Sequence, residues 1–217
     1  MKPSGIICIE GPDGVGKTTL ADHFVKEYDA VSLHATYRFK KMIPAYHEAL
    51  RHRAEMIAEM GRLAILDRHW ITEAIYARIF RGGTQWPAYT HDMDQIFQNT
   101  AVLTILCVPN SIAESLTRRE RRDEEDPANL EREKPVNAGK AYDKPQMVEL
   151  YSRYVDLWRG NLFCEGEDRV ADLTRTGGVC GREDFVQYRI EIEGQDLDSF
   201  AWNAIQQMRR LQARVAK

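Results

Sequence analysis

The sequence predicts an α/β fold in which helices cover a parallel sheet. Short apolar runs alternate along the chain with longer segments of helical period, as is typical of successive β–α–β units. The first run, residues 6–9, has no polar alternation, which is expected for a strand buried on both faces. A glycine-rich turn and then a helical segment follow this run directly. No linker divides the chain, so we expect residues 1–217 to form a single domain.

The first half of the chain contains three further strands and three helices. Apolar residues recur every three or four positions in three segments that we expect to be helices: residues 18–28, 42–60 and 71–80. Compact apolar runs predict three strands after the first: residues 31–34, 63–66 and 102–108. The last of these is the clearest strand signal in the chain.

The second half continues the same alternation. Pro109 and Asn110 end the strand before another helix. A helix that opens at Pro145 carries apolar residues on one face: Met147, Leu150, Tyr151, Tyr154 and Trp158. Residues 160–184 contain five glycines and little periodicity, so we interpret them as an irregular insertion. Alternating residues then predict a last strand, at Tyr188, Ile190 and Ile192. The final helix is expected to bury Leu197, Phe200, Ala201, Ala204, Ile205, Met208 and Leu211.

The composition excludes several classes of protein. With 217 residues, 43% of them apolar, the chain can bury a core, which excludes a disordered or collagen-like protein. The net charge of -3 shows no overall basic excess, although a local basic groove is compatible with it. The four cysteines form no CxxC pair, which favours a reducing compartment. No apolar stretch approaches the ~20 residues that cross a bilayer. We therefore expect a cytoplasmic protein without membrane contact.

A glycine-rich motif indicates phosphate binding. Residues 11–18 match the pattern G-x-x-x-x-G-K-[ST] and lie between a predicted strand and a predicted helix, the context that supports this motif. Lys17 is expected to meet the β- and γ-phosphates of ATP, and the hydroxyl of Thr18 to hold Mg²⁺. The predicted ATP-binding residues are Gly11, Pro12, Asp13, Gly14, Val15, Gly16, Lys17, Thr18 and Thr19.

A polar step follows the predicted strand at residues 63–66. Asp67 lies at the carboxyl end of this strand, beside the glycine-rich turn, and is placed to hold Mg²⁺ directly or through water. The planar fork of Arg68 suits a phosphoryl group. We therefore expect Lys17, Asp67 and Arg68 to be catalytic residues.

These two motifs resemble the thymidylate kinase family. The resemblance rests on Glu10 with the glycine-rich motif and on residues 66–76, which read LDRHWITEAIY, and it extends loosely over most of the chain. It implies a P-loop NTPase fold of the nucleotide-kinase-like type, with a five-stranded parallel sheet and helices on both faces. It also implies that Asp13 is a further catalytic residue that approaches the acceptor, and that Arg68 approaches the acceptor-side phosphate. The residues expected at a pyrimidine deoxynucleotide acceptor are Arg38, Phe39, Arg68, His69 and Glu73.

A charged run gives a second expectation from the resemblance. Residues 117–135 hold 13 charged side chains in 19, which fits either a solvated surface or a functional segment. The run falls where the family has a mobile lid over ATP. The predicted lid arginines are Arg118, Arg119, Arg121 and Arg122.

The acceptor is the least determined part of the prediction. Residues 35–64 form a shorter stretch than the corresponding part of the family, so the arm that encloses a free monophosphate is cut back. This compact version resembles phage thymidylate-kinase-like proteins, a group that includes 5-hydroxymethyluracil DNA kinases. Our first expectation is transfer from ATP to the 5-hydroxymethyl group of that base in phage DNA, in the host cytoplasm. Transfer to free dTMP is the alternative, followed by another nucleotide or nucleoside kinase and by a non-kinase ATPase.

Histidine and aromatic residues complete the expectations. His34 and His47 lack the spacing of metal ligands and are interpreted as ordinary structural residues. Tyr37 and Trp86 are candidates for stacking on a base, and either Asp13 or Glu73 is expected to orient an acceptor hydroxyl. The oligomeric state is left open, with a homodimer among the options.

Overall fold

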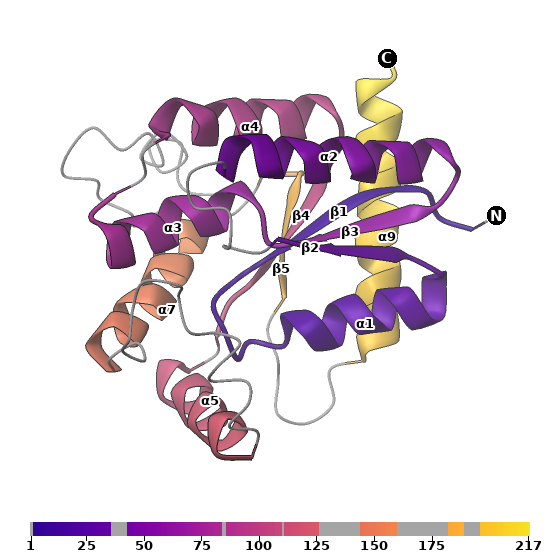
Figure 1. Ribbon diagram of the computed structural model, residues 1–217. Coiled ribbons are helices and arrows are strands. Elements are labelled where there is room, and N and C mark those ends of the chain that lie inside the picture. The colour runs from indigo at the N-terminus through magenta and orange to yellow at the C-terminus, as the bar shows by residue number, and fades with distance from the viewer. Residues whose placement is uncertain are drawn as a thin grey trace.

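Five parallel strands form one sheet in the computed structural model (Figure 1), which describes residues 2–35, 43–83, 86–109, 111–125, 144–159, 182–188 and 196–217. The strand order is β2-β3-β1-β4-β5, and every neighbouring pair is parallel. The strands are β1 (Gly5–Glu10), β2 (Val31–His34), β3 (Leu63–Asp67), β4 (Leu103–Cys107) and β5 (Phe185–Tyr188). The predicted five-stranded α/β fold is confirmed, and all five strands end at the same edge of the sheet.

Helices cover both faces of this sheet. They are α1 (Lys17–Tyr28), α2 (Ile43–Glu59), α3 (Trp70–Arg81), α4 (Pro87–Asn99), α5 (Ile112–Glu125), α7 (Lys144–Arg159) and α9 (Leu197–Val215). In Figure 1, α1 and α9 pack against one face, while α2 and α4 cover the other. Among the described residues, no helix is both long and apolar enough to cross a membrane.

The central strands are buried along their whole length. Each residue of β1, β3 and β4 is buried, because helices from both sides exclude water from them. Cys8 in β1 and Cys107 in β4 are completely buried in this layer as free thiols. The helix α9 adds the apolar stripe predicted for it, with Ala201, Ala204, Ile205, Met208 and Leu211 buried. The fold thus places its rigid centre directly under the loops at the carboxyl edge.

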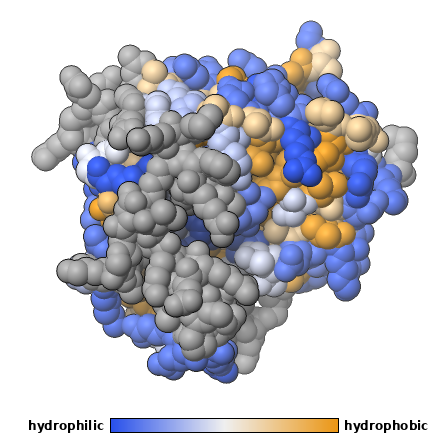
Figure 2. Space-filling view, in the orientation of Figure 1, coloured by the Kyte–Doolittle hydropathy of each residue, from blue (hydrophilic) through white to orange (hydrophobic). Residues whose placement is uncertain are grey.

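An exposed apolar surface lies along the β2 edge of the sheet. Figure 2 shows apolar side chains gathered between α1 and α2, where β2 forms the border of the sheet. The exposed apolar side chains here are Val25 of α1, Met56 of α2 and Met60 directly after α2, of which Met60 is 73% exposed. These side chains therefore flank β2, which is an edge strand of the sheet.

The helix α4 was not predicted. Its inward face alternates apolar and polar residues, with Thr90, Met93, Asp94 and Phe97 all buried. Asp94 is accommodated because Arg182 binds its two carboxylate oxygens at 2.9 and 3.2 Å. Half of the buried stripe is therefore polar, and the helical period of its apolar residues was too weak to detect.

The last strand begins earlier than predicted. The described strand covers Phe185–Tyr188, whereas the expectation centred on Tyr188 to Ile192, and residues 189–195 lie outside the described part of the chain. The predicted insertion at 160–184 is described only for its last three residues. There Arg182 binds both Asp94 and Asp184, so this end of the segment is firmly attached to α4.

Candidate active site

The phosphate-binding motif forms the connection between β1 and α1. The helix begins at Lys17 directly after Gly16, so its first N–H groups face the loop and its dipole favours an anion there. Gly11 is required by close contact, because a Cβ atom at this position would lie 2.4 Å from the carbonyl oxygen of Cys107. Thr18 and Thr19 are exposed at the start of the helix. The predicted phosphate loop therefore has the geometry of an anion site.

Lys17 is folded back over this loop. Its Nζ donates a hydrogen bond to the carbonyl oxygen of Pro12 at 2.5 Å and lies 3.9 Å from Oδ1 of Asp13. Burial, with repulsion from Arg68, lowers the pKa of Lys17 to about 8. The amine is still mostly protonated at neutral pH, so it supplies a positive charge inside the loop.

Asp13 and Arg68 bind each other. The guanidinium donates to the carboxylate of Asp13 and, at 3.0 Å, to the hydroxyl of Tyr76. Arg68 adopts a φ of 70°, which is uncommon for a residue with a side chain, and its N–H donates to the carbonyl of Ile9 at 2.9 Å. The structure thus brings together two predicted catalytic residues that are 55 positions apart.

Asp67 has one engaged and one free carboxylate oxygen. Its Oδ2 lies 2.7 Å from Nδ1 of His34, while its Oδ1 is buried without a hydrogen-bond partner among the described residues. Burial alone would raise the pKa of Asp67. The bond with His34 and the charges of Lys17 and Arg68 outweigh this effect and lower the pKa below its usual value. The side chain is therefore an anion at neutral pH.

This arrangement fits a magnesium ion that arrives with a nucleotide. The free oxygen of Asp67 and the exposed hydroxyl of Thr18 are the oxygen donors that Mg²⁺ accepts, and the ion usually keeps waters and phosphate oxygens as further ligands. Within the described residues, no group of three or more His, Cys, Asp and Glu side chains could hold a metal by itself. The donor set fits a shared protein–nucleotide site.

His34 contacts one of the predicted catalytic residues. We expected an ordinary structural residue, and its half-exposed side chain lies 2.7 Å from the carboxylate of Asp67, a contact that the sequence interpretation did not include. The two residues are direct partners in the register of β2 and β3 and end their respective strands. The signal was therefore present in the two strand ends, but it required knowing that these strands are neighbours.

Glu10 organises the turn that carries Arg68. This fully buried carboxylate accepts the N–H of His69 at 2.7 Å and the hydroxyl of Thr72. It also accepts the N–H of Thr72 at 3.4 Å, and so caps the first turn of α3, whose N-cap residue His69 provides no side-chain cap. Burial raises the pKa of Glu10 despite these bonds. A charged residue at the end of an otherwise apolar strand was the sequence signal, and it was not assigned a role.

Two predicted acceptor residues are buried. The ring of His69 is fully buried, with its Nε2 3.0 Å from the carbonyl of His47 and its centroid 5.0 Å from that of Phe97. Glu73 is also fully buried and pairs with Arg81 at 2.5 Å. In this structure the ring of His69 packs against side chains of α2 and α4, and Glu73 is ion-paired within α3. Their roles at the acceptor stay predictions.

The predicted lid is only partly described. On α5, Arg118 lies 3.7 Å from Glu114, and Arg121 binds Glu125 at 2.7 Å. The side chains of Arg119 and Arg122, residues 126–135, and the acceptor candidates Tyr37, Arg38 and Phe39 lie outside the described part of the structure. The lid and these acceptor contacts remain predictions. Trp86, the other stacking candidate, is half-buried directly before α4.

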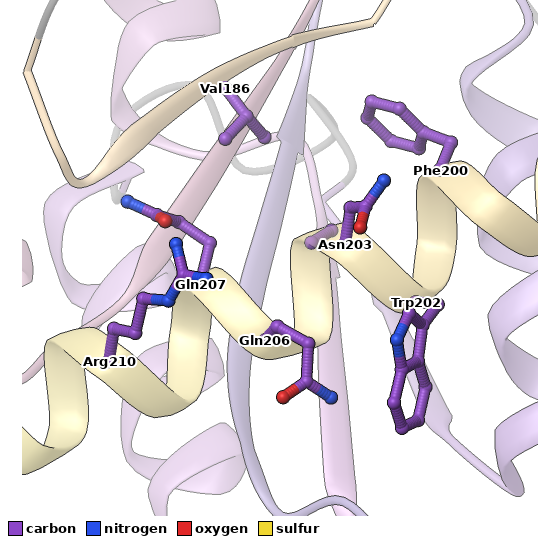
Figure 3. Close-up of a pocket in the computed structure, with 8 residues that line it drawn as sticks. Val186, Phe200, Trp202, Asn203, Gln206, Gln207 and Arg210 are labelled. Atoms are coloured by element: carbon purple, nitrogen blue, oxygen red, sulfur yellow. The ribbon is translucent and has the colours of Figure 1, made fainter.

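A separate pocket of about 490 Å³ lies along α9 (Figure 3). It is lined by Val186, Phe200, Trp202, Asn203, Ala204, Gln206, Gln207 and Arg210. None of these residues belongs to the phosphate loop or to the turn at Asp67. The pocket therefore shares no lining residue with the candidate active site.

Comparisons with known proteins identify the fold. No protein-family model matches the chain, and no curated protein sequence matches it. A structure of deoxyadenosine kinase from M. mycoides with bound dATP aligns with a TM-score of 0.54 and 13% identity, covering 93% of this chain and 99% of the other. The same kinase with dCTP gives a TM-score of 0.50 and 14% identity over 93% and 98% of the two chains. Thymidylate kinase from Candida albicans gives 0.50 and 13% identity over 96% and 94%. The chain therefore has the fold of the deoxynucleoside and thymidylate kinases.

Proposed function

We propose that the protein is a kinase that transfers the γ-phosphoryl group of ATP to a nucleoside or nucleotide acceptor. The observation that carries this proposal is the convergence of Lys17, Asp67 and Arg68 on one phosphate loop, at the edge where β1 and β3 end. The fold shared with deoxyadenosine kinase and thymidylate kinase supports it.

The proposed phosphoryl transfer does not require a covalent bond between the protein and the substrate. Phosphoryl transfer depends mainly on positioning and on neutralising charge. The loop N–H groups and Lys17 bind the phosphates, and Arg68 supplies a second positive charge for the transferred group. Asp13, which is paired with Arg68 beside the loop, is the acidic group that we expect to approach the acceptor. Bound magnesium neutralises phosphate charge, and the residues that would hold it are Thr18 and Asp67.

We further propose 5-hydroxymethyluracil within DNA as the acceptor. The support is the short connection between β2 and β3, which contains only α2 among its described residues. Less chain is then available to enclose a free monophosphate, and a base extruded from DNA needs an open site. Free dTMP is the second candidate, favoured by the likeness of the fold to a thymidylate kinase.

One experiment separates these acceptors. Wild-type protein receives γ-labelled ATP with one of four acceptors: duplex DNA containing 5-hydroxymethyluracil, the same duplex with thymine, dTMP or deoxyadenosine. Label in the modified duplex alone supports the first proposal, and label in dTMP supports the second. Label in deoxyadenosine supports the kinase proposal but contradicts both proposed acceptors. ATP hydrolysis without label in any acceptor contradicts the kinase, and Lys17→Ala serves as the inactive control.

A further inference from the structure

Two successive carbonyl groups of the phosphate loop are tied to side chains. Lys17 Nζ donates to the carbonyl oxygen of Pro12, and the hydroxyl of Tyr151 donates to that of Asp13, each at 2.5 Å. The first contact comes from within the motif. The second comes from α7, 138 residues away in the sequence. A distant helix therefore contacts the loop backbone directly.

This contact determines the direction of a loop N–H group. A trans peptide unit is planar, so the carbonyl of Asp13 and the N–H of Gly14 point in opposite directions. Because Tyr151 holds the carbonyl toward α7, the N–H of Gly14 points away from α7. No backbone hydrogen bond of the described loop uses this N–H. It remains available to a ligand of the phosphate loop.

Gly14 leaves the orientation of this peptide open to such a restraint. Its φ of 76° lies in a region that glycine occupies about as readily as the mirror region, so rotation of the Asp13–Gly14 peptide has a low cost. A hydrogen bond to the carbonyl selects one of these orientations. The restraint therefore reduces the conformational entropy that the loop loses when it binds a phosphate.

The helix α7 is a rigid support for this bond. Tyr151 is completely buried, as are Leu150 and Tyr154, and its ring is thereby fixed against the core. Tyr154, one turn further, lies with its hydroxyl 3.1 Å from that of Thr72 at the start of α3. Two tyrosine hydroxyls of α7 therefore contact the two turns of the site separately, which provides a matched control.

We propose that Tyr151 is a positioning residue that orients the Gly14 N–H for the phosphates of the nucleotide. This inference rests on the proposed function, because it requires that the loop bind phosphate. Tyr151 itself does not contact the ligand in this account. It acts only through the Asp13–Gly14 peptide.

The test compares Tyr151→Phe with Tyr154→Phe in the full chain. Isothermal titration measures the Kd of ATP, tripolyphosphate and adenosine for the wild type and both variants, and steady-state assays give KM and kcat. We expect Tyr151→Phe to weaken ATP and tripolyphosphate about tenfold, the worth of one hydrogen bond to a charged group, and to raise KM for ATP more than it lowers kcat. Adenosine binding should be unchanged. Tyr154→Phe should leave tripolyphosphate binding within about twofold.

The outcomes distinguish the two levels of the proposal. If the wild type binds tripolyphosphate and Tyr151→Phe binds it equally well, the positioning role is wrong while the kinase proposal stands. If both variants weaken all three ligands alike, the effect is general loosening of α7, and the positioning role is again wrong. If the wild type binds neither ATP nor tripolyphosphate, the proposed function falls together with this inference. Both variants keep the aromatic ring, and thermal unfolding checks that each remains folded.

Discussion

Mild acid is expected to destabilise the protein through two buried histidines. His47 and His69 lie with their ring centroids 4.5 Å apart between α2, α3 and α4, and His47 Nδ1 lies 3.0 Å from the hydroxyl of Tyr89. Burial, with repulsion between the two rings, lowers the pKa of His47 to about 2. Burial also lowers the pKa of His69, to about 4. Both rings are therefore neutral in the folded protein at any pH above about 5.

The sign and size of the effect follow from proton linkage. An unfolded histidine titrates near pH 6.5, so below that pH the unfolded chain binds protons that the folded chain does not bind. Stability is fully present above pH 6.5 and is lost as the pH falls toward the folded values. Each pH unit below 6.5 lowers the free energy of unfolding by about 1.36 kcal/mol per histidine. At pH 5 the loss is therefore about 2 kcal/mol for each histidine and about 4 kcal/mol for the pair. Typical domains have a total stability of only about 5–15 kcal/mol.

Urea unfolding at pH 7.5 and pH 5.0 measures this loss. The variant His47→Asn keeps a polar group near the position of Nδ1 but cannot titrate, so the loss between the two pH values should fall by about half. An equal loss in wild type and His47→Asn would refute the reasoning.

Three further predictions concern the proposed reaction. Lys17→Ala should abolish γ-phosphoryl transfer without a large change in the melting curve, because the hydrogen bond of its amine is made to the carbonyl of Pro12 within the same loop; activity within tenfold of wild type would contradict its role. Asp67→Asn should lower the rate and weaken the dependence on Mg²⁺, since the amide keeps the shape but loses the charge; an unchanged Mg²⁺ titration would remove Asp67 from the metal site. Among single alanine variants of the lid arginines, at least one should lose on the order of 10²-fold in rate, measured by the same transfer assay, whereas four normal rates would make the run a solvated surface. These arginines are Arg118, Arg119, Arg121 and Arg122.

The strands and the phosphate loop could be predicted because their signals are local in the sequence. A run such as that in β3 is apolar throughout because both of its faces are covered, and the loop motif needs only eight consecutive residues. The helix α4 lacked such a signal, since a buried aspartate paired with Arg182 takes the place of an apolar residue. Propensity and period do not register a polar residue whose partner lies far along the chain.

The contacts of the site depend on neighbours that the sequence does not reveal by itself. His34 meets Asp67 only because β2 and β3 are adjacent in the sheet, and Arg68 meets Asp13 only because the turn after β3 lies beside the phosphate loop. His69 was predicted at the acceptor because it adjoins Arg68 in the sequence. The turn directs the two side chains differently, so His69 enters the core between α2 and α4.

The two thiols at the centre of the sheet make the folded protein resistant to alkylating reagents at these positions. Only a thiolate reacts readily, and burial raises the pKa of Cys107 to about 12 and that of Cys8 well above its usual range. Both side chains are also shielded from a reagent by the layers of helices. Modification of Cys8 or Cys107 therefore requires the sheet to open. Mass spectrometry of the corresponding peptides measures the rate of modification, which reports how often the sheet opens. A ligand that binds only the folded phosphate loop lowers this rate by the factor 1 + [L]/Kd, so the rate falls exponentially with the free energy of stabilisation that the ligand adds.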